Sequence, residues 1–309
     1  MREFAGRTAV ITGGGSGIGE ALAWRFAYAG MNLVIADIEA ASAERVSGAL
    51  RVAGHAAIAL QTDVADGASV ERLAERSEAV YGSVELLCNN AGVVPSGRHR
   101  AVWEYPLEDW RWALDVNLMG VLHGLRSFVP RMLAHGQPAH IVNTASVAGL
   151  ISGSGSAVYS ATKHAVVRVT EALYASLAER GAPIGVTALC PGLTATRIYE
   201  SERNRPEALT PAAGAAPETP ELQAIAASLY ATAMSPAAVA DQCFDAVYHD
   251  RLYQVTTDSF DAAIRERTTA ILERRNPVFP SLLELARRDV MTTAGASQVA
   301  GLTPDRSVE

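Results

Sequence analysis

The stretch TGGGSGIG (12–19) decides the fold because of the two runs that flank it. It follows the short β-rich run TAVIT (8–12) and opens a run with helical spacing, GEALAWRFAYAG (19–30). A strand that turns through glycines into a helix presents free backbone N–H groups and the positive end of the helix to an anion. Because glycine has no Cβ, a phosphate group can approach this backbone closely. The stretch therefore predicts a pyrophosphate-binding turn, with a plain tight turn between strand and helix as the alternative.

Beyond this turn, short β-rich runs alternate with longer helical runs. Further strands are expected at 32–37, 55–63, 84–92, 139–146, 183–192 and 252–257. Further helices are expected at about 40–53, 66–81, 107–135, 157–180, 236–249 and 258–275. Strands that are apolar on both faces and alternate with helices predict a parallel sheet covered on both sides. Right-handed crossovers then give an α/β fold in three layers, with a doubly wound parallel sheet.

The segment 193–235 interrupts this alternation after the sixth strand. It contains several prolines and shows little periodicity. An irregular insertion of this length is typical of a functional lid or of disorder. We expect one domain over 1–290 that includes this lid, followed by a tail at 291–309, whose small and polar residues suggest an extended end.

Composition argues against several classes of function. A net charge of -7 with scattered positive charges argues against nucleic acid as a partner. No apolar stretch is long enough to span a membrane, and the first strand begins too early for a signal peptide. Three cysteines at unrelated spacings, Cys88, Cys190 and Cys243, predict buried free thiols in the cytoplasm, with no metal site.

Asp37 closes the second predicted strand, 24 residues after Gly13. A carboxylate at this place can accept hydrogen bonds from the adenosine ribose hydroxyls of a dinucleotide, and it repels a 2′-phosphate. Neither Ser16 nor Ile38 offers the arginine that a 2′-phosphate requires. We therefore predict NAD rather than NADP as the cofactor, and the alternative is that Asp37 caps a loop.

The run YSATK (159–163) contains Lys163, the only lysine among 26 basic residues. Tyr159 lies one helical turn before it, so the two side chains share a helix face. A phenol has a pKa near 10, and a nearby ammonium favours the phenolate; lowering this pKa by about three units corresponds to about 4 kcal/mol. Arginine has a bulkier planar head and cannot present a compact ammonium to two ribose hydroxyls. The spacing indicates a tyrosine that acts as acid and base, although one lysine could also fall here by accident.

Together, the motifs resemble the short-chain dehydrogenase/reductase family, in the branch formed by a single Rossmann domain. The matching stretches are TGGGSGIG, Asp63-Val64, Asn89-Asn90-Ala91-Gly92, Asn117 in DVNLMG, Ser146, YSATK and Pro191-Gly192. The resemblance covers residues 5–195 well and 236–275 by pattern only. It also implies a homodimer or homotetramer that associates through the helices at 107–135 and 157–180.

The resemblance implies a role for each matching residue. Tyr159 is the general acid and base, and Lys163 lowers its pKa and holds the nicotinamide ribose. Ser146 binds the substrate oxygen, and Asn117 keeps a water in a proton relay. The implied cofactor-binding residues are Gly13, Ser16, Gly17, Ile18, Gly19, Asp37, Asp63, Val64, Asn90, Ala91, Gly92, Tyr159, Lys163, Pro191, Gly192, Thr194 and Thr196. Taken alone, Asn117, Ser146 and Asp63 could instead belong to a helix kink, a strand end and a turn.

The implied reaction interconverts a secondary alcohol and its ketone by hydride transfer with NAD. The loops at 93–105, 147–158 and 193–230 follow strands, where ligands bind in such sheets. They are largely apolar, which predicts a bulky hydrophobic alcohol or ketone, aromatic or terpenoid. Trp103 and Tyr199 either contact this substrate or pack in the core. The rival functions are an NADP-dependent 3-oxoacyl reductase or other ketoreductase, a sugar epimerase relative and a non-catalytic NAD sensor.

Overall fold

The structure, a computed structural model, describes residues 1–95, 100–153, 156–211 and 233–278. Within them, seven parallel strands form one sheet in the order β3-β2-β1-β4-β5-β6-β7. The strands are β1 (Thr8–Thr12), β2 (Asn32–Asp37), β3 (Ala57–Gln61), β4 (Leu86–Asn89), β5 (Ala139–Thr144), β6 (Ile184–Cys190) and β7 (Tyr253–Val255). The order reverses between β1 and β4, so the sheet is doubly wound and the predicted α/β fold is confirmed.

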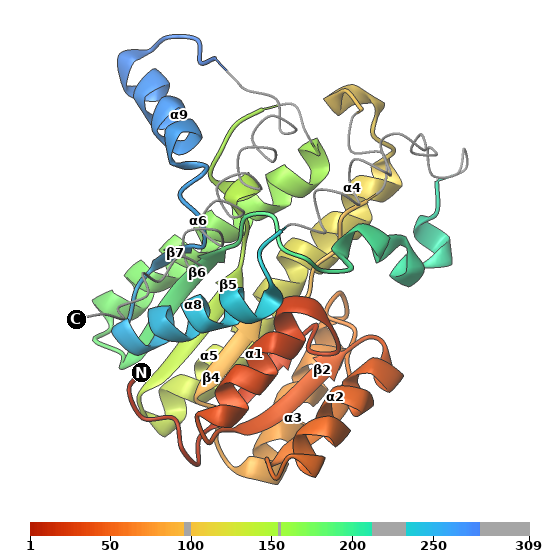
Figure 1. Ribbon diagram of the computed structural model, residues 1–309, viewed down its shortest axis with the longest axis vertical. Helices are drawn as coiled ribbons and strands as arrows, with labels where there is room; N and C mark the ends of the chain where they lie inside the picture. The colour runs from red at the N-terminus through yellow and green to blue at the C-terminus, as the bar shows by residue number, and fades with distance from the viewer. Residues whose placement is uncertain (96–99, 154–155, 212–232, 279–309) are drawn as a thin grey trace, which may run out of the picture.

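Helices cover both faces of this sheet (Figure 1). Side chains of α1, α2 and α8 share an apolar cluster on one face, and those of α3, α5 and α6 share another on the opposite face. The helices are α1 (Gly17–Tyr28), α2 (Ala40–Val52), α3 (Gly67–Tyr81), α4 (Leu107–Ala113), α5 (Gly120–His135), α6 (Ala157–Glu179), α8 (Pro236–His249) and α9 (Asp261–Glu273).

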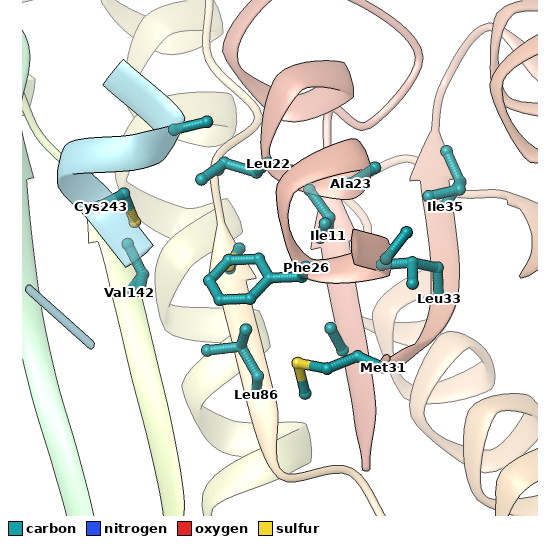
Figure 2. Close-up of a cluster of buried hydrophobic side chains, with 14 of the residues drawn as sticks. Ile11, Leu22, Ala23, Phe26, Met31, Leu33, Ile35, Leu86, Val142 and Cys243 are labelled. Atoms are coloured by element: carbon teal, nitrogen blue, oxygen red, sulfur yellow. The ribbon is translucent and has the colours of Figure 1, made fainter. Parts of the chain in front are cut away.

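The apolar core under α1 fixes the position of the glycine-rich turn. Figure 2 shows Leu22 and Phe26 of α1 beside Ile11 of β1 and Leu33 of β2, and all four are fully buried. Truncating a buried side chain of this size to alanine costs about 2–5 kcal/mol. This packing therefore holds α1 firmly on the sheet and places its N-terminus at the end of β1.

The predicted helix over 107–135 is not one uniform helix. A π-helical segment, Leu114–Met119, separates α4 from α5. Asn117 lies in this segment, and its side-chain amide bonds both the N–H and the carbonyl of Val93. A π-helical turn is wider than an α-helical turn and is frequent at functional sites. The apolar spacing of the sequence predicts the extent of the helical region and cannot reveal this widened turn.

The start of the insertion after the sixth strand is folded, where the sequence predicts an irregular lid. It forms two short 3₁₀ helices, Ile198–Asn204 and Glu207–Leu209. A β-bridge between Thr194 and Met234 joins the two ends of the insertion. The rest of the predicted lid, 212–232, and the predicted tail, 291–309, lie outside the described residues.

Some expectations from composition can be compared with the described part of the chain. Cys88, Cys190 and Cys243 are all buried and free, as predicted. Burial raises the pKa of Cys190 and of Cys243 to about 12, so both thiols stay protonated. Among the helices of these described residues, none is both long and apolar enough to cross a membrane.

Candidate active site

A cavity runs along the carboxyl ends of the strands, and we call it the strand-end cavity. Residues that follow each of the six strands β1 to β6 line it. Ligands bind at this edge in doubly wound sheets because the helices start there and their N-termini point inward. All the predicted site residues border this cavity except Gly19 and Asn117.

The glycine-rich turn forms one end of the cavity. Gly13 and Gly17 have positive φ angles of 62° and 55°, which glycine adopts without strain. Gly19 does not border the cavity, but a Cβ there would lie 2.0 Å from the carbonyl oxygen of Gly13. The absence of a Cβ at Gly19 therefore allows the first turn of α1 to pack closely against the backbone of Gly13.

Asp37 lies beside this turn at the end of β2. Its Oδ2 accepts a hydrogen bond from the N–H of Gly15 at 2.9 Å, and its Oδ1 accepts one from the N–H of Glu39 at 3.0 Å. Burial raises the pKa of the Asp37 carboxyl, and the two backbone donors oppose this rise. Asp37 thus caps its own loop, as the alternative has it, and also borders the cavity, as a cofactor-binding residue would.

Two arginines that the cofactor prediction did not consider lie near Asp37. Arg45 of α2 donates to the carbonyl of Gly15 at 2.8 Å and pairs with Glu20 at 2.7 Å. Arg203, from the first 3₁₀ helix of the insertion, borders the cavity and pairs with Glu39 at 2.9 Å. Both arginines are far from the turn in the sequence, so a local pattern around the turn cannot predict them. Each is already paired with a carboxylate.

Lys163 and Tyr159 share the cavity-facing side of α6, as the spacing predicts. Lys163 is 2% exposed, and its Nζ donates to the carbonyl of Thr144 at 2.7 Å. Nζ lies 5.6 Å from the centre of the Tyr159 ring. Burial lowers the pKa of Lys163 from its ordinary 10.5 to about 8. An ammonium of this kind remains largely charged at neutral pH.

Ser146 reaches the same part of the cavity from the end of β5. Its hydroxyl accepts from the N–H of Ala148 at 3.1 Å and donates to the carbonyl of Pro191 at 3.4 Å. The residue also begins the short 3₁₀ helix Val147–Gly149. A hydroxyl at the strand end and the Tyr159–Lys163 pair are therefore brought to one cavity from separate elements.

Asn117 lies behind the cavity and is fully buried. Its Oδ1 accepts from the N–H of Val93 at 2.8 Å, and its Nδ2 donates to the carbonyl of Val93 at 2.9 Å and to the Thr162 hydroxyl at 3.0 Å. That hydroxyl donates in turn to the carbonyl of Tyr159 at 2.8 Å. Asn117 thus ties the loop after β4 to the turn of α6 that carries Tyr159.

The remaining predicted residues are held in place by loop contacts. The Thr12 hydroxyl accepts from the N–H groups of Asn90 and Ala91 at 2.9 and 3.1 Å. Asp63 accepts from the N–H of Ala65 at 2.9 Å, as a turn residue does, while bordering the cavity. Gly192 donates to the Thr256 hydroxyl at 3.1 Å. The other predicted residues that border the cavity are Ser16, Ile18, Val64, Gly92, Pro191, Thr194 and Thr196.

The apolar side of the cavity differs from the prediction. Trp103 is 83% exposed, and neither it nor Tyr199 borders the strand-end cavity; Tyr199 borders a neighbouring hollow beside α1. Trp112 of α4 borders it instead, although its helical spacing fits an ordinary core position. Other apolar residues on the cavity include Val94, Val147, Pro206 and Leu209, which lie in the three predicted loops, and Phe260, which lies outside them.

Comparison with known proteins identifies the family. The profile of the short chain dehydrogenases matches residues 7–207, more than half of the chain. A 1-deoxy-11-beta-hydroxypentalenate dehydrogenase from Streptomyces exfoliatus is 37% identical over 262 residues, which cover 84% of this chain and 86% of the relative. A 3beta-hydroxysteroid dehydrogenase 2 from Eggerthella lenta is 35% identical over 235 residues, which cover 74% of this chain and 89% of the relative.

A solved structure agrees with these relatives. The crystal structure of a short-chain dehydrogenase/reductase from Burkholderia phymatum in complex with NAD superimposes with a TM-score of 0.84. Its sequence is 42% identical, and the match covers 91% of this chain and 99% of that chain. The chain therefore belongs to the short-chain dehydrogenase/reductase family, whose members are oxidoreductases that act on CH–OH groups with a nicotinamide cofactor.

Proposed function

We propose that the protein is an NAD-dependent dehydrogenase that interconverts a bulky hydrophobic secondary alcohol and its ketone. The observation that carries this proposal is the meeting of Ser146, Tyr159 and Lys163 in one cavity with the glycine-rich turn. The glycine-rich turn suits a dinucleotide because Gly13 and Gly17 take positive φ angles where the cavity meets the N-terminus of α1, and the backbone N–H groups of such a turn bind a pyrophosphate. When bound, the nicotinamide supplies or accepts the hydride.

The proton chemistry belongs to side chains of the chain. Tyr159 removes the alcohol proton in oxidation and returns one to the developing alkoxide in reduction. The charged form of Lys163 favours the tyrosinate, because an ammonium close to a phenol lowers its pKa. The Ser146 hydroxyl orients the substrate oxygen. Asn117 holds the loop after β4 and, as the family resemblance implies, keeps a relay water near Lys163.

Asp37 is the main support for NAD rather than NADP. A 2′-phosphate beside this carboxylate would meet a like charge, and Glu39 adds a second carboxylate two residues later. Arg45 and Arg203 are the features that favour the rival NADP-dependent ketoreductase. Their pairing with Glu20 and Glu39 occupies both guanidinium groups. The relative solved with NAD is consistent with the same preference.

The apolar lining supports a bulky hydrophobic substrate. Trp112, Phe260 and Leu209 border the cavity, and none of them carries a charge. The names of two relatives give a hydroxypentalenate and a hydroxysteroid as substrates of those proteins. Both are consistent with a secondary alcohol on a ring system as the substrate here.

The test is the initial rate of NADH formation with a panel of alicyclic and aromatic secondary alcohols, run in parallel with NAD and NADP. The Tyr159→Phe variant should abolish turnover and retain NAD binding, because it removes only the acid–base hydroxyl. Tyr174→Phe, also on α6 and half-exposed, is the matched control and should keep full activity. NAD binding without turnover by the unchanged protein would favour the sensor function, and faster rates with NADP would favour the ketoreductase.

A further inference from the structure

The strand-end cavity has an apolar wall made by two separate parts of the chain. We define this apolar wall as Trp112 of α4 together with Pro206 and Leu209 of the insertion, all of which border the cavity. Helix α4 packs against the start of α6, where Ala113 and Val158 share a cluster next to Tyr159. The wall therefore belongs to the side of the cavity where the substrate meets the catalytic tyrosine.

Arg205 joins the two parts of the wall without bordering the cavity. Its side chain is 4% exposed, and its Nη2 donates to Oδ1 of Asp109 at 2.7 Å, where the Asp109 side chain is 3% exposed. Its Nη1 donates to the carbonyl of Leu209 at 2.9 Å, and its Nε donates to Glu202 at 2.6 Å. The guanidinium thus fixes α4 to the second 3₁₀ helix of the insertion.

The same guanidinium also holds the indole of Trp112. Its central carbon lies 4.2 Å from the centre of the ring, within the range of a cation–π contact. Asp109 and Trp112 are three residues apart on α4, so they lie on one face of the helix. Arg205 can therefore pair with the carboxylate and cover the indole at the same time.

The buried ion pair between Arg205 and Asp109 is not an efficient source of stability by itself. Burial raises the pKa of the Asp109 carboxyl, and Arg205 opposes this rise. The attraction within a buried ion pair offsets the cost of removing both charges from water only if the geometry is good and further hydrogen bonds are made. Apolar side chains of similar volume often give the same stability. What the planar fork of arginine adds is a fixed orientation of several partners.

We propose that Arg205 is a positioning residue that fixes the shape of the apolar wall and thereby decides which large substrates the enzyme accepts. This proposal rests on the function proposed above. Arg205 acts through Trp112 and Leu209 and touches neither the reacting atoms nor the cofactor cradle. Its loss should therefore affect large substrates much more than small ones, and should leave cofactor binding unchanged.

The test compares the reduction of 2-decalone, a bicyclic ketone, with that of 2-butanone, using NADH and the full chain. We expect Arg205→Met to lower kcat/KM for 2-decalone by about tenfold or more, mainly through KM, and to change that for 2-butanone by less than about threefold. The dissociation constant of NADH should stay the same. An equal loss for both ketones, weaker NADH binding, or no change at all would overturn the proposal.

Arg131→Met is the matched control. Arg131 also bonds two carboxylates and one carbonyl, those of Glu71, Glu78 and Ser127, but it joins α5 to α3 away from the cavity. It should leave the ratio of the two ketones unchanged. If Arg205→Met does not fold, Arg205→Lys decides the matter. It keeps the charge and loses the fork, so it should shift the ratio in the same direction.

Failure of the proposed function can be told apart from failure of this inference. If the unchanged protein reduces neither ketone, the proposed function fails, and binding of 2-decalone is then followed by tryptophan emission. Binding that Arg205→Met weakens about tenfold would still support the positioned wall. Equal binding by both proteins, or none by either, would overturn it.

Discussion

The ammonium of Lys163 donates a hydrogen bond to the carbonyl of Thr144 at the end of β5. Lys163 itself lies one helical turn after Tyr159. That bond and its position explain why the group can be buried while charged. The carbonyl supplies one partner, and the others would come from a ligand in the cavity. Without a bound ligand, a buried ammonium with so few partners lowers the stability of the folded protein.

Replacing Lys163 with methionine should therefore stabilise the protein while abolishing turnover. Each pKa unit corresponds to about 1.4 kcal/mol, so a fall from 10.5 to about 8 is a cost of about 3 kcal/mol at neutral pH. Loss of the bond to Thr144 offsets about 1 kcal/mol of this gain. Urea unfolding of the protein without ligand, at pH 7, measures the difference.

The pH dependence of that difference has a definite sign. Because the pKa of Lys163 is lowered in the folded protein, the unfolded chain binds more protons between pH 8 and 10.5. The stability of the unchanged protein should thus rise relative to that of Lys163→Met as the pH increases from about 8. Titrating groups that do not interact with Lys163 cancel in the comparison, and a lowering of the Tyr159 pKa by this ammonium would act in the same direction. A difference that stays constant from pH 7 to pH 10 would contradict the buried ammonium.

Asp37→Asn should reduce the preference for NAD over NADP. Removing one negative charge from beside the 2′-position removes a repulsion of about 1–2 kcal/mol, which corresponds to about tenfold in the ratio of the two dissociation constants. Titration with NADH and NADPH, followed by nucleotide fluorescence, measures this ratio. Asp245→Asn, on α8 and half-exposed, is the control and should leave the ratio unchanged.

Two glycines within helices should respond in opposite ways to alanine. Gly19→Ala should weaken NAD binding at least tenfold and destabilise the fold, because its Cβ would lie 2.0 Å from the Gly13 carbonyl oxygen. Gly48→Ala, in α2, meets nothing closer than an arginine side-chain nitrogen at 3.8 Å and should stabilise by about 0.5–1 kcal/mol. Thermal unfolding and NADH titration of both variants provide the measurement.

Asn117→Ala should destabilise the protein and also slow turnover. It leaves the N–H and carbonyl of Val93 without their buried partner, at a cost of about 2–4 kcal/mol. Asn32→Ala loses one exposed bond to the Gly6 carbonyl and should cost less than about 1 kcal/mol. Urea unfolding of the two variants measures the contrast. Similar losses in both would show that Asn117 is not the tie between β4 and α6.

The strands and the cavity could be predicted because both follow from local patterns. An apolar run such as that of β2 reports its own burial, and the topology of a parallel sheet then gathers the residues after each strand. Asp37 and Ser146 each end a predicted strand, so this edge gathers them, whereas the roles of Ser146 and Tyr159 at the site are what the family resemblance implies. Some strands are shorter than predicted. The strand predicted at 84–92, for example, is Leu86–Asn89 in the structure, and Asn90 belongs to the loop that follows.

The parts that could not be predicted depend on contacts between distant segments. Arg45 and Arg203 approach Asp37 only after α2 and the insertion have packed, and no spacing records this. The neighbouring residues in the sequence do not distinguish Trp103 from Trp112. Of the two, only Trp112 packs against the Arg205 guanidinium and borders the cavity. Asn117 of the widened turn likewise bonds the backbone of Val93, which lies in another loop.

The solitary lysine has a consequence for the surface of the molecule. Every other basic residue among the 26 is an arginine, so Lys163 carries the only side-chain primary amine in these 309 residues. The Met1 amine is half-buried and donates to the carbonyl of Val247, at the opposite end of the sheet from the cavity. Acylating reagents and amine-directed cross-linkers therefore find no side-chain target on the outside. Any lysine that they do label marks entry into the catalytic centre, and a bound dinucleotide should protect it.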